Sequence, residues 1–371
     1  MTRRFSILAL WLLLFAPWPA VGEEPSTDPF SLASAADLAL VGPDNLQLPE
    51  PCGGFNLFLA VERPAGCPRV AAADDAATEP SPGGEPVTRP HEPWLDRAPW
   101  LKRALPYMIP IGLTAAGVAT ALPDGRLRPF RFTDEGWFGA GTYAGGADKA
   151  AHFVNYTILS RELIYLYKEL GYSDRASILL GSSMGLLEGL VNEFADGFNR
   201  YGFSPQDAAM DTFGAGLSAL LVATRTDDLV GFRSGFLLPR SDVTCCAVPG
   251  KGEDYSNHIY TADLKLAGAE RRLGRYIGPL RYLMFSVTYG SKFYPSGPPE
   301  LRERQVGFEI GLNFEEILNS LGVRRDKWWG YGLHVFFDNI RVPFTAVGFQ
   351  YGLNRGRWYG PGNGNQYSTN P

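Results

Sequence analysis

Basic residues are not in excess in this 371-residue sequence, which has 34 Lys and Arg against 39 Asp and Glu and a formal net charge of −5. A mildly acidic chain lacks the positive surface that binds a phosphate backbone, so we expect no nucleic-acid partner. The sequence also lacks a nucleophile elbow, a phosphate-binding loop and an ordered Ser/His/Asp set. These absences favour a structural or binding protein over an enzyme, and the sequence predicts no particular cofactor.

Cysteine is scarce, with four residues in the sequence. Neither Cys52/Cys67 nor Cys245/Cys246 has the two-residue gap of a zinc knuckle, which disfavours a structural zinc site. In an exported chain the four can form two disulfides in three possible connectivities, with Cys52 to Cys67 as the local alternative.

The N-terminus has the pattern of a secretory signal peptide over residues 1–22. Arg3 and Arg4 precede an apolar stretch at 5–15, and small residues follow at 20–22. Removing two arginines leaves 32 basic against 39 acidic residues, so the expected net charge becomes −7. No cysteine stands at the expected cleavage point, which argues against lipid attachment through an N-terminal cysteine.

Residues 23–97 are rich in Pro, Ala and acidic residues, a composition that predicts a mostly disordered tether.

The nineteen residues from Ala104 to Leu122 carry no charge, and a helix of this length is close to the length that crosses a bilayer. Pro106 and Pro110 weaken a spanning interpretation, because each removes a backbone donor. We expect a buried or interfacial helix there. In the polar link that follows, Asp134 and Glu135 are expected to be solvated loop acids.

A first helix is predicted from Asp148 to about Leu170. Asp148 and His152 stand at positions i and i+4, so their side chains share one face. Asp148 also lies in the first turn, where a carboxylate interacts favourably with the helix dipole.

A second helix is predicted from Ser173 to Ala195. Gly181, Gly185 and Gly189 repeat every four residues, a ridge that lets two helix backbones approach closely. We expect Asn192 and Asp196 to extend this ridge, Glu188 to lie beside it, and Glu193 to point away from Asn192.

A third helix is predicted from Pro205 to Ala223, with Ser204 as its N-cap and Pro205 at its first position. Asp207, Asp211, Ala215 and Ser218 form a small, polar face. If the polar faces of the three helices turn toward one another, the apolar faces point outward, as in a domain that contacts lipid. A water-soluble domain remains open if the C-terminal half covers those faces.

Beyond Ser241 the pattern alternates with the period of a strand, most clearly in Val306-Phe308-Ile310-Leu312. Similar runs predict strands at 260–266, 283–289, 331–337 and 347–353. They suit either an antiparallel sheet on the helices or strands of outer-membrane type, and a helix start at Asn313-Phe314-Glu315-Glu316 favours the sheet. We therefore predict an α+β fold, a bundle of about four helices (98–240) with a C-terminal antiparallel β region (241–360) and a flexible tail (361–371).

The candidate site is a polar pocket between the helices. One imidazole among carboxylates can exchange protons or bind a cation, and carboxylates bind hard cations better than zinc. The competing interpretation treats the same groups as caps and buried pairs, with Lys149 pairing with an acid and His152 with Asp207 or Asp211. Candidates for catalysis are His152, Asp148, Glu193, Asp196, Asp207 and Asp211, and weaker candidates for metal are Asp207, Asp211 and Glu193.

Three motifs carry a resemblance: D-K-A-A-H-F at 148–153, N-E-F-A-D-G at 192–197 and G-F-S-P-Q-D-A-A-M-D at 202–211. They resemble the YfiM-like family of predicted periplasmic lipoproteins, and the likeness extends over residues 100–360. A fainter similarity is to VanZ-like membrane proteins. The resemblance implies a location in the cell envelope and the same polar cluster, and it implies no reaction. The missing cysteine departs from the family's lipoprotein label.

Together these observations predict an exported, membrane-associated envelope protein, in the periplasm or at the outer membrane of a Gram-negative bacterium. Membrane lipid is the expected partner, with an envelope protein as a second possibility. The alternative is an envelope acid/base enzyme or cation-binding protein that uses the cluster on a lipid or glycan.

Overall fold

The computed structural model describes residues 94–120, 127–236, 255–294 and 297–362, which all belong to one compact unit. The expected signal peptide, nearly all of the expected tether, the four cysteines and residues 363–371 lie outside these ranges. A short 3-10 helix, η3 (Trp94–Arg97), occupies the last residues of the expected tether.

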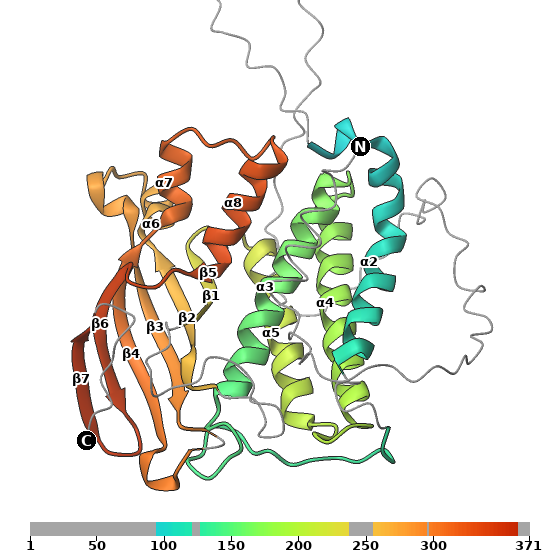
Figure 1. Ribbon diagram of the computed structural model, residues 1–371. Helices are drawn as coiled ribbons and strands as arrows, with labels where there is room; N and C mark the ends of the chain where they lie inside the picture. Colours follow the sequence, from blue (N-terminus) through green and yellow to red (C-terminus); the bar gives the residue numbers. More distant parts are fainter. Residues whose placement is uncertain (1–93, 121–126, 237–254, 295–296, 363–371) are drawn as a thin grey trace, which may run out of the picture. The chain divides into compact units, whose positions relative to one another are not determined.

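Four helices form the bundle in Figure 1. They are α2 (Pro99–Thr120), α3 (Ala147–Glu169), α4 (Asp174–Asp196) and α5 (Pro205–Ala223). Side-chain caps set two of the starts, because the Ser173 and Ser204 hydroxyl oxygens accept hydrogen bonds from the backbone N–H of Ala176 and Asp207. The predicted bounds of α5 are confirmed at both ends.

The glycine ridge on α4 brings α3 and α5 close to it. A Cβ atom at Gly181 would lie 2.4 Å from the backbone nitrogen of Ile164 on α3, and one at Gly189 would lie 2.7 Å from Asp211 Oδ2 on α5. The ridge continues at the same four-residue step into Glu193, which is buried. The prediction that Asn192 and Asp196 extend the ridge is therefore wrong, because the step of four from Gly189 leads to Glu193.

Residues 104–120 of the charge-free run predicted as a helix belong to α2, and Pro106 and Pro110 both lie inside it. Leu105 and Ile109 pack against α3 residues, while Trp100, Ile111 and other apolar side chains of α2 are exposed. Among the described helices, none combines the length and apolar character needed to cross a membrane.

A seven-stranded sheet follows the bundle, in the order β5-β1-β2-β3-β4-β6-β7. Neighbouring strands are antiparallel except for β1 and β5, which are parallel. The predicted α+β fold, with a helical bundle and a C-terminal sheet, is confirmed, and the one parallel pair makes the sheet mixed. The strands are β1 (Val230–Phe236), β2 (His258–Lys265), β3 (Leu283–Lys292), β4 (Glu303–Leu312), β5 (Ile340–Arg341), β6 (Ala346–Gly352) and β7 (Arg357–Gly362).

Three α-helices interrupt the β region: α6 (Leu266–Leu273) between β2 and β3, and α7 (Phe314–Ser320) and α8 (Trp328–Asn339) between β4 and β5. The helix start at Asn313 is confirmed, since its side-chain oxygen accepts from the Glu316 N–H. The strand predicted at 331–337 is wrong, because α8 occupies it. Alternating apolar residues misled the prediction, whereas the helix is fixed by packing of Phe337 on Phe314 and by ion pairs of Asp338 with distant chain segments.

The helical bundle, predicted over residues 98–240, ends earlier than expected, because β1 at 230–236 already belongs to the sheet. At the C-terminal end, β7 reaches into the tail predicted from residue 361.

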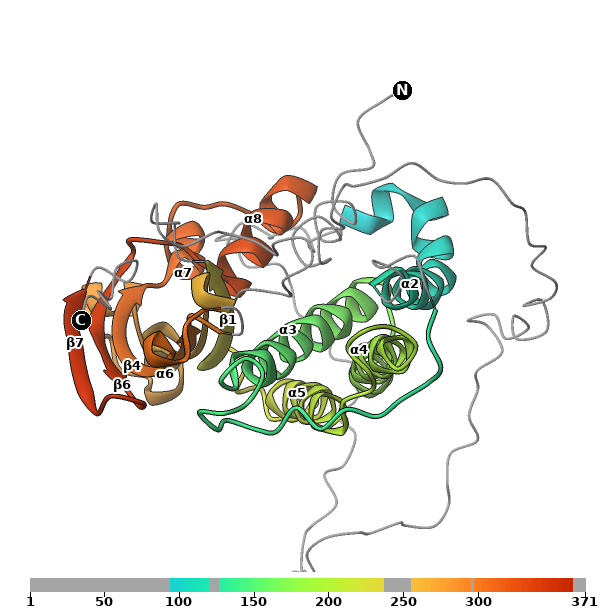
Figure 2. The ribbon, with the colours of Figure 1, turned by 60° about the horizontal axis from the view of Figure 1, so that its bottom comes forward.

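The bundle and the sheet meet along α3, where Val154 and Ile158 share a core with Phe232 of β1 and Tyr260 of β2. Figure 2 shows α3 between the sheet and the helices α4 and α5.

The sheet has an inverted distribution of polarity. Across β2, β3, β4 and β6, most buried positions carry polar or small residues, such as the register row Asp263, Ser286, Glu309 and Gly348. Ile259, Tyr260 and Met284 are buried apolar exceptions. The alternate positions carry apolar side chains that are exposed. Two register rows define this apolar sheet face: Leu264, Phe285, Ile310 and Val347, then Ala262, Val287, Phe308 and Phe349.

Candidate functional site

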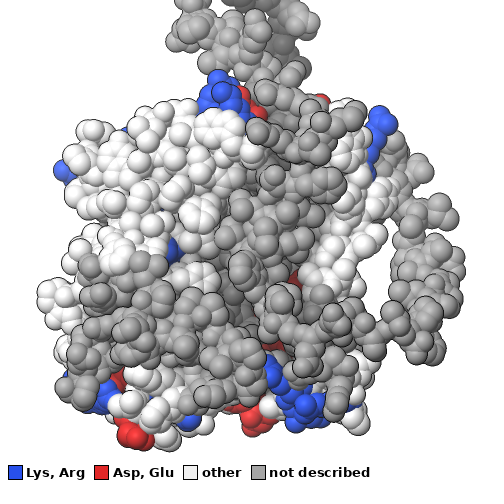
Figure 3. Space-filling model, in the orientation of Figure 1, with Lys and Arg blue, Asp and Glu red and all other residues white. Residues whose placement is uncertain are grey.

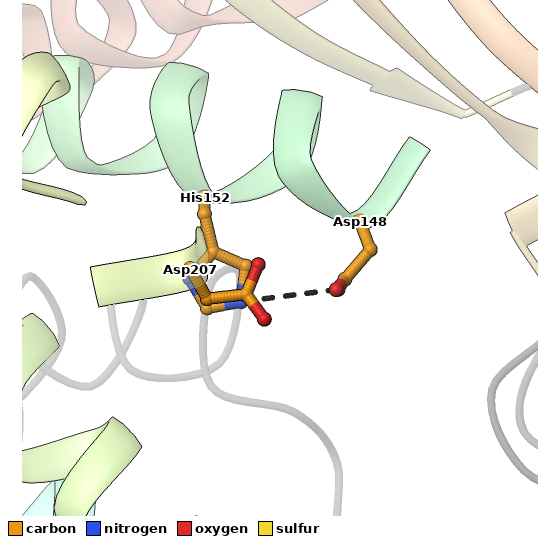
Figure 4. Close-up of side chains that lie close together, drawn as sticks. All are labelled: Asp148, His152 and Asp207. Atoms are coloured by element: carbon orange, nitrogen blue, oxygen red, sulfur yellow. Dashed lines mark ion pairs between the residues drawn. The ribbon is translucent and has the colours of Figure 1, made fainter. Parts of the chain in front are cut away.

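His152, one turn into α3, lies at the centre of a cluster between α3, α4 and α5. Its Nδ1 lies 2.8 Å from Asp211 Oδ1 and 3.7 Å from Glu193 Oε1. Its Nε2 lies 3.8 Å from Asp148 Oδ1 and 3.9 Å from Asp207 Oδ1, and Figure 4 shows this second side of the ring. Each ring nitrogen therefore faces a pair of carboxylates.

Lys149 neutralises one half of this cluster. Its buried ammonium nitrogen lies 2.7 Å from Glu135, 2.8 Å from Asp148 and 2.7 Å from Asp207. Asp148 also accepts a hydrogen bond of 2.5 Å from the Tyr255 hydroxyl. The carboxylates on the Nε2 side of His152 thus have a cation of the protein's own within contact distance.

On the Nδ1 side of His152, no lysine or arginine among the described residues forms an ion pair with Asp211 or Glu193. Asp211 is fully buried, and its Oδ2 atom accepts no hydrogen bond from the part of the chain that the structure describes. Glu193 is held through Oε2 by the backbone N–H of Ser204 at 3.1 Å, which leaves Oε1 on the His152 side. Two acids with one imidazole therefore occupy this half.

The environment shifts the pKa values of these groups in different directions. Burial would lower the pKa of His152, but the carboxylates of Asp207 and Asp211 outweigh burial and raise it well above its ordinary value. Burial raises the pKa of Glu193 to about 9 against the opposing effect of His152. Burial also raises the pKa of Asp148, but His152 and Lys149 reverse this and lower it below its ordinary value. At neutral pH we expect a charged His152, an ionised Asp148 and a protonated Glu193.

Five of the six predicted site residues come together here, and Asp196 does not. Its carboxylate accepts a hydrogen bond of 2.5 Å from the Asn199 side chain, and it belongs to neither group of potential metal ligands around His152. Glu193 is in the cluster because it continues the glycine ridge, although the prediction had it facing away from Asn192.

Sequence reasoning missed two acids. Glu135 comes from the loop before α3, and its interpretation as a solvated acid is wrong, since its side chain is 11 % exposed and contacts Lys149. Burial raises its pKa to about 8, aided by Asp148 and opposed by Lys149. Glu188 is hydrogen-bonded with Tyr156, and burial raises its pKa to about 7. The one available signal for Glu188 was its place beside the ridge, and nothing local marked Glu135.

The cluster has the residue types for two kinds of chemistry. A protonated and an ionised carboxylate on either side of an imidazole can accept and donate protons. Alternatively, His152 with two carboxylates can bind a divalent cation, and two such groups have their ligand atoms within 4.8 Å of one another: Asp148, His152 and Asp207, and His152, Glu193 and Asp211.

Residues 134–223, which include α3, α4 and α5, match a family described as predicted periplasmic lipoprotein (DUF2279), a domain of unknown function. This match supports export to the periplasm. The comparisons with curated proteins and with solved structures give no match. The finer resemblances to YfiM-like and VanZ-like proteins stay predictions.

Proposed function

We propose that the protein is a membrane-associated component of the bacterial cell envelope, acting by structure or binding, which contacts lipid through the apolar sheet face and the outer faces of its helices. The observation that carries this proposal is the inverted sheet. Phe308 and Val347, for example, are 57 % and 60 % exposed, while Asp263 and Glu309 behind them are buried. A sheet in water normally places these two kinds of side chain the other way round.

The helices support the same arrangement. The charged cluster around His152 faces the bundle interior. Large apolar side chains are exposed on three of the helices: Trp100, Ile111, Val118, Leu179, Leu190, Phe194, Phe213 and Leu220. In Figure 3, most of the charged side chains on the displayed face lie toward its upper and lower ends, and the described surface between them is largely uncharged. An extended uncharged surface of this kind is typical of contact with lipid or another apolar partner.

Charge substitutions on the apolar sheet face test the proposal. Val287 and Phe308 are register partners, so Val287→Asp with Phe308→Asp places two charges together on this face. Leu321→Asp is the matched control, because Leu321 is 73 % exposed but lies after α7, outside the sheet. The purified exported protein is floated with phospholipid vesicles in a density gradient.

We expect the wild type and Leu321→Asp to float, and the double variant to lose about tenfold or more of its vesicle-bound fraction, because charges in hydrocarbon are costly. Circular dichroism checks that the variants are folded. Equal flotation of all three proteins would contradict lipid contact through this face.

A second candidate function is an acid/base enzyme or cation-binding protein of the envelope, acting on a lipid or glycan. It is favoured by the position of His152 between two carboxylate pairs. His152→Ala tests it: a folded, correctly localised variant with a lost cellular phenotype supports this candidate, and loss of the fold with no separable activity supports a structural role.

A further inference from the structure

Acidic groups outnumber cationic groups around His152. The cations are Lys149 and His152, and the carboxyl groups that contact them within 4 Å across the cluster number five: Glu135, Asp148, Glu193, Asp207 and Asp211. Buried carboxylates are costly unless a cation or hydrogen-bond donors compensate them. The excess of acid therefore calls for further positive charge, either as protons on groups such as Glu193 and Glu135 or as a bound cation.

The position of Lys149 decides on which side of His152 that charge is needed. Asp148 and Asp207 each lie within 2.8 Å of its ammonium nitrogen, so the Nε2 side already holds a cation. On the Nδ1 side, Asp211 and Glu193 have His152 as their cationic neighbour. Asp211 Oδ2, buried on a side chain with 0 % exposure, accepts no hydrogen bond from the described residues.

We infer that His152 Nδ1 and the carboxylates of Asp211 and Glu193 bind a divalent first-row transition-metal cation such as zinc. The three residues lie close enough for one ion, with Nδ1 at 2.8 Å from Asp211 and 3.7 Å from Glu193. Ligands that surround zinc tetrahedrally at about 2.1 Å are about 3.4 Å apart, a value between these two distances. Binding replaces the Nδ1 proton, and water completes the coordination.

Neighbouring groups already orient these ligands. The Ser204 N–H holds one oxygen of Glu193, and Asp148 and Asp207 stand near the opposite ring nitrogen, as carboxylates do behind many metal-bound histidines. Gly189 leaves room for the Asp211 carboxylate, because a Cβ atom there would lie 2.7 Å from Oδ2. Calcium is disfavoured, since it takes six to eight oxygen ligands and this set includes an imidazole.

The inference specifies the second candidate function and is independent of membrane association. Its test is titration of zinc into the EDTA-treated, full exported chain by isothermal calorimetry. The cysteines are first blocked with N-ethylmaleimide, because thiolates also bind zinc. Cobalt serves as a second probe, since its visible absorption reports the coordination directly.

We expect one saturable zinc equivalent per chain in the wild type. Asp211→Asn and Glu193→Gln should each lower the affinity by about tenfold or more, because even groups behind metal ligands contribute 10- to 100-fold. Glu188→Gln is the matched control, a carboxylate on α4 that pairs with Tyr156 and lies outside the ligand set, and it should stay within about threefold of the wild type.

Absence of saturable zinc uptake and of a cobalt spectrum in the wild type would overturn the inference, even if the variants fail to fold. Unchanged zinc affinity in a folded Asp211→Asn would overturn it as well. Vesicle flotation in EDTA, measured in parallel, separates this failure from a failure of the proposed membrane contact.

Discussion

Buried charges in the sheet are arranged differently from buried charges between the helices. In the sheet they form matched pairs: Arg341 with Glu309 at 2.8 Å, both side chains at 0 % exposure, and Arg233 with Asp263 at 2.7 Å. Between the helices, five carboxyl groups share Lys149 and His152. A matched pair neutralises itself and can fix strand register, whereas an unmatched cluster needs protons or a cation from outside. The matched pairs of the sheet therefore have a structural role, whereas the acid-rich cluster of the bundle is a candidate functional site.

The largest effect that tests this comparison is expected in the sheet. Arg341→Met should lower the free energy of unfolding by about 3–5 kcal/mol, because it leaves the Glu309 carboxylate buried without its guanidinium. Arg341→Met with Glu309→Leu should recover most of this loss. Urea unfolding measures both variants, and a cost below about 1 kcal/mol for the single variant would show that the pair is not needed.

In the bundle, the close approach of α3 and α5 to α4 brings the acidic side chains together. Gly181→Ala tests whether the structure depends on this close approach. The added Cβ atom would lie 2.4 Å from the Ile164 backbone nitrogen, so we expect a loss of about 1–3 kcal/mol in unfolding free energy. Gly216→Ala on α5 is the matched control, since nothing lies within 4 Å of its added Cβ atom. It should stabilise the protein by up to about 1 kcal/mol through helix propensity. Equal effects of the two variants would break the account of the ridge.

The excess of acid also predicts a pH dependence for the metal-free protein. Burial raises the pKa of Glu188 from 4.5 to about 7, with Asp211 adding to the rise and the Tyr156 hydrogen bond opposing it. The folded protein keeps a proton that the unfolded chain releases, so the free energy of unfolding falls as pH rises from 4.5 to about 7. Glu188→Gln should reduce this fall by up to about 3 kcal/mol, because one pKa unit corresponds to about 1.4 kcal/mol. If the free energy of unfolding changes with pH in the same way in the variant and the wild type, the predicted role of Glu188 is wrong.

The smallest effect is expected on the apolar sheet face in water. Val287→Asp with Phe308→Asp changes exposed side chains, so the unfolding free energy of the vesicle-free protein should change by no more than about 0.5 kcal/mol per site. A loss of several kcal/mol would mean that this face is covered by protein in the free chain, and the vesicle experiment would then need substitutions at other positions.

The sequence was informative wherever local chemistry decides the structure. Ser204 and Pro205 set the start of α5, the four-residue glycine step predicted the helix contacts, and Asp148 and His152 share a face through their spacing. Partners from distant segments were out of reach. Glu135 meets Lys149 through the path of a loop, and α8 is stabilised by Asp338 pairing with Arg161, which is 177 residues away.

The sequence also predicted the alternation of apolar and polar residues along the strands, but it did not predict which of the two sides is buried. Val306 to Leu312 alternate in the same way whether the apolar or the polar side is buried. Ion pairs such as that of Arg341 with Glu309 decide which side is buried. Arg341 lies in the edge strand β5, which three strands separate from β4 in strand order. The polar interior therefore depends on tertiary contacts.

The most direct test of lipid contact is photo-crosslinking in growing cells. p-Benzoylphenylalanine replaces Phe308 on the apolar sheet face, or Leu321 as the control, and cellular lipids carry a radiolabel. If the apolar sheet face contacts lipid, irradiation should give a lipid adduct at position 308 and much less adduct at position 321. A protein adduct at 308 with no lipid adduct would contradict lipid contact and identify an envelope protein partner instead.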